Sequence, residues 1–315
     1  MGMTATKLSE KGRGRLITLA SLKEGTTDSF DGTKISYRSF GQGDPPIICC
    51  NGLGVSTFFW TYLEKHFRFS RQVVTWDYRG HGKSELKKNT KHYNITALVQ
   101  DCLAVLDELK VKKGVFIGHS LGTQVIFELY RLHPERVAAL VPCFGTYGNV
   151  MNTFYNSRLS RYAFNIAYFL GTTFPKQSNI LSTFLLQNPL SFWMGGLLKM
   201  MDTGMMTKAD SDRYIKHILS VDPLYFTMLL KSAQDHTAEE ILQTIKVPSL
   251  IIAGELDQFT PVWLSKKMHR LIPKSELFVV KKATHAGLVE QHDAINLRIE
   301  KFLDDSLGRA RRHAG

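Results

Sequence analysis

The sequence predicts an α/β protein with a mostly parallel central sheet, helices on both faces of that sheet and an inserted helical cap. Short runs of apolar, mostly β-branched residues alternate with segments of helical period, which is the pattern of strands joined by crossover helices. The alternation stops after Pro142 and resumes near Pro248, so a different segment interrupts it. A chain of 315 residues, 43% hydrophobic and 22% charged, has an ordinary globular composition and can bury a large core.

The first predicted strands form a hairpin. Residues 24–30 and 33–40 are rich in β-formers, and the turn-forming pair Asp31-Gly32 joins them. Four apolar runs, at 46–50, 72–76, 114–117 and 137–141, then predict the strands of the parallel part. Helical spacing of apolar residues separates these strands at 58–67, 95–109 and 121–132.

The interrupting segment, residues 147–237, is expected to be a helical lid. It holds seven of the ten methionines and many aromatic residues. Because so much apolar surface needs cover, we expect most of these side chains to pack in a core and roof the cleft, with a few forming an adaptable acyl pocket. The residues concerned include Phe154, Tyr162, Phe164, Tyr168, Phe169, Phe184, Phe192, Trp193, Met194, Met200, Met201, Met205 and Met206.

Strand and helix patterns return after the insertion. Runs at 248–253 and 277–280 predict strands, and 261–271 and about 290–303 predict helices. The main domain therefore consists of residues 23–146 and 238–305. Basic tails, 1–22 and 306–315, flank it.

The strongest chemical signal is Gly-His-Ser-Leu-Gly at 118–122, a G-x-S-x-G segment between a predicted strand and a predicted helix. A serine on such a sharp turn projects its hydroxyl above the sheet. The turn brings neighbouring backbone so close that only glycine fits on either side of it. Ser120 is thus the candidate nucleophile, and His119 is interpreted as a pocket-lining neighbour.

A serine hydroxyl needs a base within hydrogen-bond reach, and that base needs a partner that fixes its tautomer. His285 lies just after the last predicted strand, and Asp257 follows the strand before it. Both fall at the carboxyl ends of strands, the edge where open α/β sheets bind ligands. Glu255 competes with Asp257 as the acid, and the spacing of Asp257 to Pro261 favours Asp257.

Attack on a carbonyl creates an oxyanion, which requires N–H donors that are already in position. We expect the backbone N–H groups of Leu53 and Leu121 to supply them. Leu53 lies in a glycine-rich turn after the strand at 46–50, and Leu121 directly follows the nucleophile. Asn51 and Gly52 in the same turn are predicted to line the substrate pocket.

These motifs resemble the α/β-hydrolase superfamily, in the serine-nucleophile branch with an inserted helical lid. The resemblance covers roughly residues 24–303 and is carried by 51–54, Asn-Gly-Leu-Gly, by 76–84, by 118–122, and by Asp257 and His285. It implies that 77–84, including His81, is a structural loop. Many relatives have histidine where Asn51 stands. Asn at this place also occurs in enol-lactonase-like relatives, which raises lactones as substrates.

The expected activity is hydrolysis of lipophilic carboxylic esters, as in esterases and lipases, through an acyl-enzyme on Ser120. Several alternatives keep the same three residues: a lactonase or enol-lactonase, a C–C bond hydrolase, a thioesterase, or a haloperoxidase with perhydrolase activity. A non-catalytic ligand receptor of the same fold is disfavoured because Ser120, Asp257 and His285 are all present. Epoxide hydrolases and haloalkane dehalogenases use aspartate where Ser120 stands.

The remaining features of the sequence limit which partners and which cellular location are expected. The net charge is +12, but the basic residues are scattered and accompany no nucleic-acid-binding motif, so no nucleic-acid partner is expected. Metal motifs and cofactor motifs are likewise missing. No apolar run is long enough for a signal peptide or a spanning helix, which leaves peripheral membrane contact open. Four cysteines in apolar segments predict buried reduced thiols and a cytoplasmic protein: Cys49, Cys50, Cys102 and Cys143.

Overall fold

The computed structural model describes residues 22–88, 90–157, 159–186, 196–197, 199 and 201–308. Its centre is an eight-stranded sheet in the order β1-β2-β4-β3-β5-β6-β7-β8. The first two strands run antiparallel to their neighbours, and all other pairs are parallel. The predicted α/β fold is confirmed. The strands are β1 Lys23–Asp28, β2 Lys34–Phe40, β3 Ile47–Cys50, β4 Val73–Trp76, β5 Gly114–His119, β6 Val137–Cys143, β7 Ser249–Gly254 and β8 Ser275–Val280.

Helices follow the strands as predicted, with ends that differ by a few residues. Those of the main domain are α1 Thr61–Phe67, α2 Ile95–Glu108, α3 Leu121–Leu132, α9 Val262–Leu271, α10 Gly287–Glu290 and α11 His292–Leu307. Short 3-10 turns are η1 Thr57–Trp60, η2 Thr90–His92, η3 Pro134–Arg136, η4 Val150–Asn152, η5 Phe154–Asn156 and η6 Glu239–Thr244.

The sheet separates two apolar cores because alternate residues of each strand point to opposite faces. Ile48 and Cys50 of β3 belong to the core that contains α2, α3 and α9. Ile47 and Cys49 belong to the core that contains α1 and α11. Both faces are therefore covered, as buried parallel strands require.

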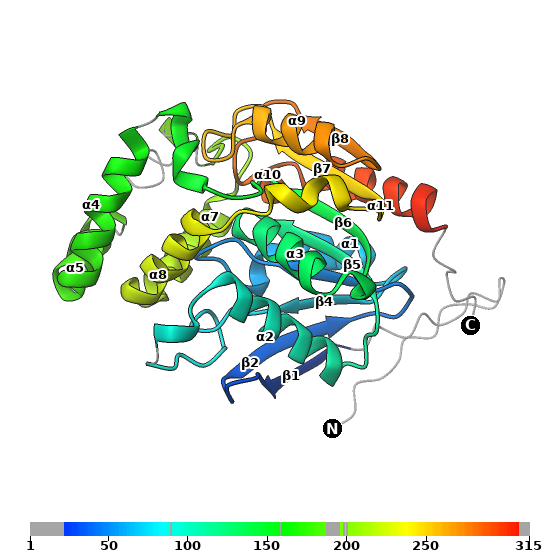
Figure 1. Cartoon of the computed structure of the whole chain (residues 1–315), viewed down its shortest axis with the longest axis horizontal. Coiled ribbons are helices and arrows are strands. Elements are labelled where there is room, and N and C mark those ends of the chain that lie inside the picture. Colours follow the sequence, from blue (N-terminus) through cyan, green and yellow to red (C-terminus); the bar gives the residue numbers. More distant parts are fainter. Residues whose placement is uncertain are drawn as a thin grey trace, which may run out of the picture.

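Between β6 and β7 the described chain is helical, as the interruption of the strand pattern predicts. The helices are α4 Leu159–Thr173, α5 Pro175–Leu186, α7 Lys208–Ser220 and α8 Pro223–Asp235. Figure 1 shows α4 and α5 side by side at the outer edge of the molecule, with α8 between them and the main domain. Four of the expected lid residues, Phe192, Trp193, Met194 and Met200, lie outside the described residues, as do most of the two basic tails.

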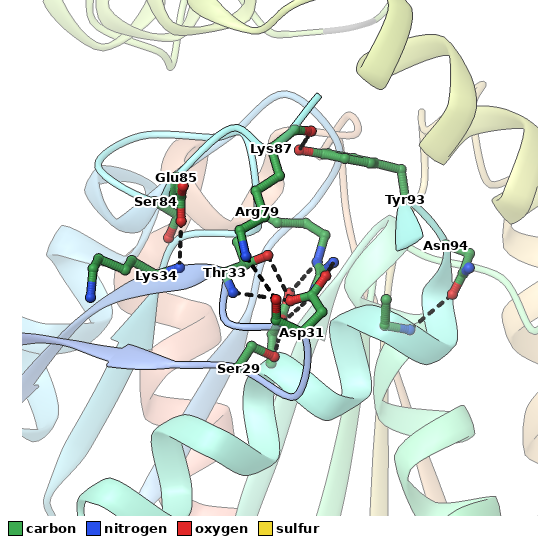
Figure 2. Close-up of polar contacts among 12 residues, drawn as sticks. Ser29, Asp31, Thr33, Lys34, Arg79, Ser84, Glu85, Lys87, Tyr93 and Asn94 are labelled. Carbon is green, nitrogen blue, oxygen red and sulfur yellow. Dashed lines mark hydrogen bonds and ion pairs between the residues drawn. The ribbon is translucent and has the colours of Figure 1, made fainter. Parts of the chain in front are cut away.

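The loop after β4 is held by a buried ion-pair network (Figure 2). Arg79 donates to Asp101 of α2, with Nε to Oδ2 at 2.8 Å, and to Asp31 of the β1–β2 turn, with Nη1 to Oδ2 at 3.0 Å. Ser29 and Thr33 donate to the same two carboxylates. Burial by itself would raise the pKa of Asp31, but the hydrogen bonds from Thr33 and Arg79 lower it to about 2. The network joins the hairpin, this loop and α2, which supports a structural role for 77–84.

The four cysteines are buried and unpaired, which confirms the prediction of reduced thiols. No helix in the described part of the chain is both long enough and apolar enough to cross a bilayer. The cytoplasmic location stays a prediction.

Candidate active site

Ser120 lies on the turn that joins β5 to α3, and its backbone is held at φ 53° and ψ −115°, a conformation that side-chain-bearing residues rarely adopt. Its N–H donates to the Cys143 carbonyl of β6 at 3.0 Å, which fixes the turn to the sheet. A Cβ atom on Gly118 would lie 2.3 Å from the Gly122 carbonyl oxygen, and one on Gly122 would lie 2.1 Å from that of Cys50. The expectation that only glycine fits at both flanking positions is confirmed.

The structure brings Ser120, His285 and Asp257 together at the carboxyl edge of the sheet. His285 Nε2 lies 3.0 Å from Ser120 Oγ, and His285 Nδ1 lies 2.9 Å from Asp257 Oδ2. A carboxylate only accepts hydrogen bonds, so Nδ1 carries the proton and Nε2 presents its lone pair to the serine hydroxyl. This tautomer is the one that general-base catalysis requires.

Asp257 is fixed by donors from its own loop. Its Oδ1 accepts from the backbone N–H groups of Phe259 and Thr260, and its Oδ2 accepts from the Thr260 hydroxyl at 2.7 Å as well as from His285. Glu255 lies on the surface instead and accepts from the Lys282 N–H. The geometry therefore favours Asp257 over Glu255. The sequence predicts no role for Phe259 and Thr260 in holding Asp257. Their place in the same turn is the one signal that could have shown it.

Aromatic rings surround the imidazole of His285. Phe259 stacks on it with ring centroids 4.9 Å apart, and the centroid of the His119 ring lies 5.1 Å from that of His285. Burial, together with His285, lowers the pKa of His119 to about 3, so its ring is neutral. His119 Nε2 lies 3.1 Å from the His285 carbonyl oxygen and therefore donates to it. His119 thus lines the pocket, as predicted, and also fixes the backbone of His285.

The two residues expected to supply the oxyanion donors belong to turns that adjoin Ser120. Leu121 begins α3, where backbone N–H groups have no partner within the helix. No carbonyl of the described backbone accepts a hydrogen bond from the N–H of Leu53 or Leu121. The turn that holds Leu53 packs against the nucleophile, because a Cβ on Gly52 would lie 3.2 Å from Ser120 Cβ.

The side chain of Asn51 points into the core, so the prediction that it lines the pocket is wrong, whereas the place of Gly52 in the pocket stays a prediction. Asn51 is fully buried: its Nδ2 donates to the Trp76 carbonyl at 2.7 Å, and its Oδ1 accepts from Trp60 Nε1 at 2.6 Å. Both ends of the amide are occupied by the core. Gly52 packs against the His119 ring. Lactones, which the resemblance at Asn51 raises, stay an alternative substrate class.

A cavity of about 240 Å³ opens above Ser120. It is walled by residues of the main domain and of the helical insertion, and the described lining contains no Asp, Glu, Lys or Arg. Met151, Met201 and Met206 contribute to it, as expected of some insertion methionines, whereas Met205 is exposed. The other lining residues are Leu53, Phe59, His119, Ser120, Val150, Phe154, Tyr214, Ile218, Phe226, Leu230, Phe259, Thr260, His285 and Ala286.

His217 of α7 is a residue near the site that was not anticipated. Its Nδ1 donates to the Gly54 carbonyl at 2.8 Å, and its Nε2 accepts from the Gly82 N–H at 3.2 Å. It thereby ties the insertion to the turn that holds Leu53. The sequence gives no signal for this contact, because it depends on how α7 packs against turns that are far away in the chain. Among the described residues no group of three or more His, Cys, Asp or Glu side chains is placed to hold a metal ion.

A serine on a strained strand-to-helix turn, joined through a histidine to a buried aspartate, is the arrangement that serine hydrolysis requires. A family model described as the alpha/beta hydrolase fold matches residues 45–291. The chain therefore belongs to the α/β-hydrolase fold family, as the resemblance of its motifs indicates.

Two of the relatives are distant in sequence but match along nearly their whole length. A putative 2-succinyl-6-hydroxy-2,4-cyclohexadiene-1-carboxylate synthase of Bacillus subtilis (strain 168) is 25% identical over 87% of this chain and 96% of the relative. A pimeloyl-[acyl-carrier protein] methyl ester esterase of Vibrio campbellii is 23% identical over 86% of this chain and 98% of the relative. The solved structure of an esterase from Exiguobacterium antarcticum superposes with a TM-score of 0.73 at 16% identity, covering 90% of this chain and 100% of the esterase, which shows the shared fold.

Proposed function

We propose that this protein is a serine hydrolase that cleaves lipophilic carboxylic esters, with Ser120 as nucleophile, His285 as general base and Asp257 as the acid that orients the histidine. The observation that carries the proposal is the bridging position of the His285 ring, 3.0 Å from Ser120 Oγ and 2.9 Å from Asp257 Oδ2. An exposed serine hydroxyl without this partner is a weak nucleophile.

The reaction has two steps. Ser120 Oγ attacks the ester carbonyl as its proton moves to His285 Nε2. The tetrahedral intermediate then collapses, the alcohol leaves with that proton, and the acyl group stays on Ser120. Water attacks the acyl-enzyme in the same way, giving its proton to His285, and the carboxylic acid leaves as the hydroxyl of Ser120 is restored.

The charge on the oxyanion would be met by the N–H groups of Leu53 and Leu121. One such donor is typically worth about 3–4 kcal/mol of transition-state stabilisation. Both belong to the backbone, so side-chain substitutions at 53 and 121 would leave the donors in place.

The lining of the cavity supports a lipophilic substrate. Methionine and aromatic side chains surround the serine, and a charged acyl or alcohol group would lose its hydration there without gaining an opposite charge. We also propose that residues 147–237 act as the lid, since Phe154, Ile218 and Phe226 of this segment form one wall of the cavity. The Vibrio relative is named as a methyl ester esterase, which is consistent with the cleavage of an ester bond.

A fluorophosphonate probe and a series of p-nitrophenyl esters test the proposal. The probe should label the protein on Ser120, and labelling should be abolished in Ser120→Ala and strongly reduced in His285→Ala. Ester turnover should rise with acyl chain length until the cavity is full. Absence of labelling in the intact protein would favour a ligand receptor, and cleavage of polar lactones without any ester would rule out the substrate class.

A further inference from the structure

Helix α4 exposes an apolar stripe along its length. Leu159, Tyr162, Ile166 and Phe169 are spaced by three or four residues, so they lie on one side of the helix. Their exposed fractions are 73%, 67%, 62% and 61%. The opposite side of α4 carries Phe164 and Gly171, which are buried.

This stripe overturns part of the expectation that the insertion's aromatics are core residues. Tyr162, Phe169 and Phe184 are exposed, whereas Phe164 is buried and Phe154 lines the cavity. The neighbouring helix α5 adds Ile180 and Leu181, which are also exposed. We call residues 159–186 the α4–α5 arm. Monomeric soluble proteins rarely leave such contiguous apolar surface uncovered, so the arm has the character of a binding surface.

The charge pattern of this part of the chain points to the kind of partner. No Asp or Glu occurs from residue 136 to residue 201, while Arg136, Arg158, Arg161, Lys176 and Lys199 do. Within the arm, Arg161 and Lys176 are exposed as well. Exposed aromatic and aliphatic residues flanked by basic residues, with no acid, are typical of helices that lie in the interface of an anionic membrane.

We propose that the α4–α5 arm docks the protein on the surface of an anionic lipid bilayer, with the stripe of α4 inserted at the level of the headgroups. A second copy of this chain fits the surface less well. Two arms packed together would bring their arginine and lysine residues near one another without a carboxylate from the same segment between them. Anionic headgroups supply the opposite charge that the arm itself lacks.

The position of the arm links such docking to the cavity. Helix α4 packs on α8, with Gly171 so close to Thr227 that an added Cβ would lie 3.1 Å from its hydroxyl oxygen. Phe226 and Leu230 of α8 line the cavity. A docked arm would therefore hold the cavity beside a source of lipophilic esters. The docking stands apart from the proposed chemistry, so its test uses the Ser120→Ala protein, which cannot hydrolyse the vesicles.

The test is co-sedimentation of full-length Ser120→Ala protein with vesicles of phosphatidylcholine and with vesicles of phosphatidylcholine and phosphatidylglycerol in equal parts. We expect binding to the anionic vesicles to be at least roughly tenfold stronger, since two basic residues at a charged surface give a preference of this order. Adding Phe169→Asp should weaken that binding by roughly tenfold, because it places a charge on the stripe. Leu297→Asp, at a 59% exposed leucine of α11 on the main domain, is the matched control and should leave binding unchanged.

A second pair of variants tests the charge contribution. Arg161→Gln with Lys176→Gln should remove most of the preference for anionic vesicles, whereas Lys112→Gln with Lys113→Gln, two exposed lysines before β5, should reduce it much less. Equal effects of arm and control variants would assign binding to the general basic charge or to the tails and overturn the proposal. Dimerisation without vesicle binding, measured by light scattering, would identify a second copy as the occupant and also overturn it.

Discussion

Two buried clusters in this molecule join a carboxylate to a nitrogen-bearing side chain, and they differ in what they leave open. In the Arg79 network the oxygens of Asp31 and Asp101 accept from Arg79, Ser29 and Thr33, and the Arg79 side chain is only 2% exposed (Figure 2). In the Ser120 site the Asp257 oxygens are equally well occupied, but the His285 side chain is 13% exposed and faces a cavity.

The difference indicates two roles for similar chemistry. A closed ion-pair network contributes to folding, and removing one partner leaves a buried charge uncompensated. In the second cluster, Ser120 on its strained turn and the His285 ring both border a cavity that a substrate can enter. Substitutions in the two clusters should therefore separate effects on activity from effects on stability.

The largest expected effect is that of Ser120→Ala on turnover. Loss of the nucleophile should lower kcat by about 10⁶-fold, or about 8 kcal/mol of transition-state stabilisation. Stability should stay within about 0.5 kcal/mol of the wild type, because the residue is half-buried and the change is small. Ester kinetics and urea unfolding measure the two quantities. A variant that unfolds more easily and keeps its turnover would contradict the assignment of this cluster.

The next effect is that of Asp257→Asn, which removes the charge that orients His285. We expect a decrease in kcat of about 10⁴-fold, as for the loss of tautomer control in serine hydrolases. Glu255→Gln is the matched control, since Glu255 lies two residues away on the surface and bonds to the Lys282 N–H. If both variants lost activity equally, the acid would be misassigned.

Arg79→Met should lower the stability of the fold and leave the catalytic rate nearly unchanged. Removing the guanidinium leaves Asp101 and Asp31 without their main partner, and the free energy of unfolding should fall by about 3–5 kcal/mol. The folded fraction should retain near wild-type kcat. Lys83→Met is the control, because the Lys83 side chain is exposed and its contact with Glu24 is a surface ion pair. A selective loss of kcat in a stable Arg79→Met protein would show that the loop has a part in catalysis.

The two clusters were unequally predictable from the sequence. The proposed active-site residues lie at the ends of three predicted strands, and a parallel sheet brings such ends to one edge, so strand order and glycine spacing were sufficient to predict that these residues meet. The partners of Arg79 come from a hairpin turn and from a helix more than 20 residues away. No local pattern encodes that meeting, which depends on how the sheet twists and packs.

Asn51 and the α4–α5 arm show the same limit in different ways. Asn51 follows a strand at the edge of the sheet where Ser120 lies, but its side chain points toward Trp60 and Trp76. The packing of the core determines this direction, and the sequence pattern does not show it. The apolar residues of α4 recur with helical period, which predicts an amphipathic helix. The period does not predict which side of the helix packs against the rest of the protein. Exposure of Ile166 and Phe169 follows from the place where α8 meets the helix.

The smallest effect concerns pH and two buried histidines, His81 of the loop after β4 and His119 beside His285. Burial lowers the pKa of His81 to about 4 and that of His119 to about 3. In the unfolded chain both rings protonate near pH 6.5, so between about pH 6.5 and 4 the unfolded state binds more protons, and stability falls as the pH falls. Each ring should contribute about 1.4 kcal/mol per pH unit in this window, or about 2 kcal/mol between pH 6.5 and 5.

Urea unfolding at several pH values measures this slope. His119→Phe, which keeps an aromatic ring against Phe59, should lower the slope by about half, although its absolute stability also changes through loss of the bond to the His285 carbonyl. His269→Gln, at an exposed histidine of α9, should leave the slope as in the wild type. Asp31, with its pKa of about 2, adds a separate loss of stability only below about pH 4. A slope unchanged by His119→Phe would mean that this ring is protonated in the folded protein, and it could not then be the neutral neighbour that holds His285 beside the nucleophile.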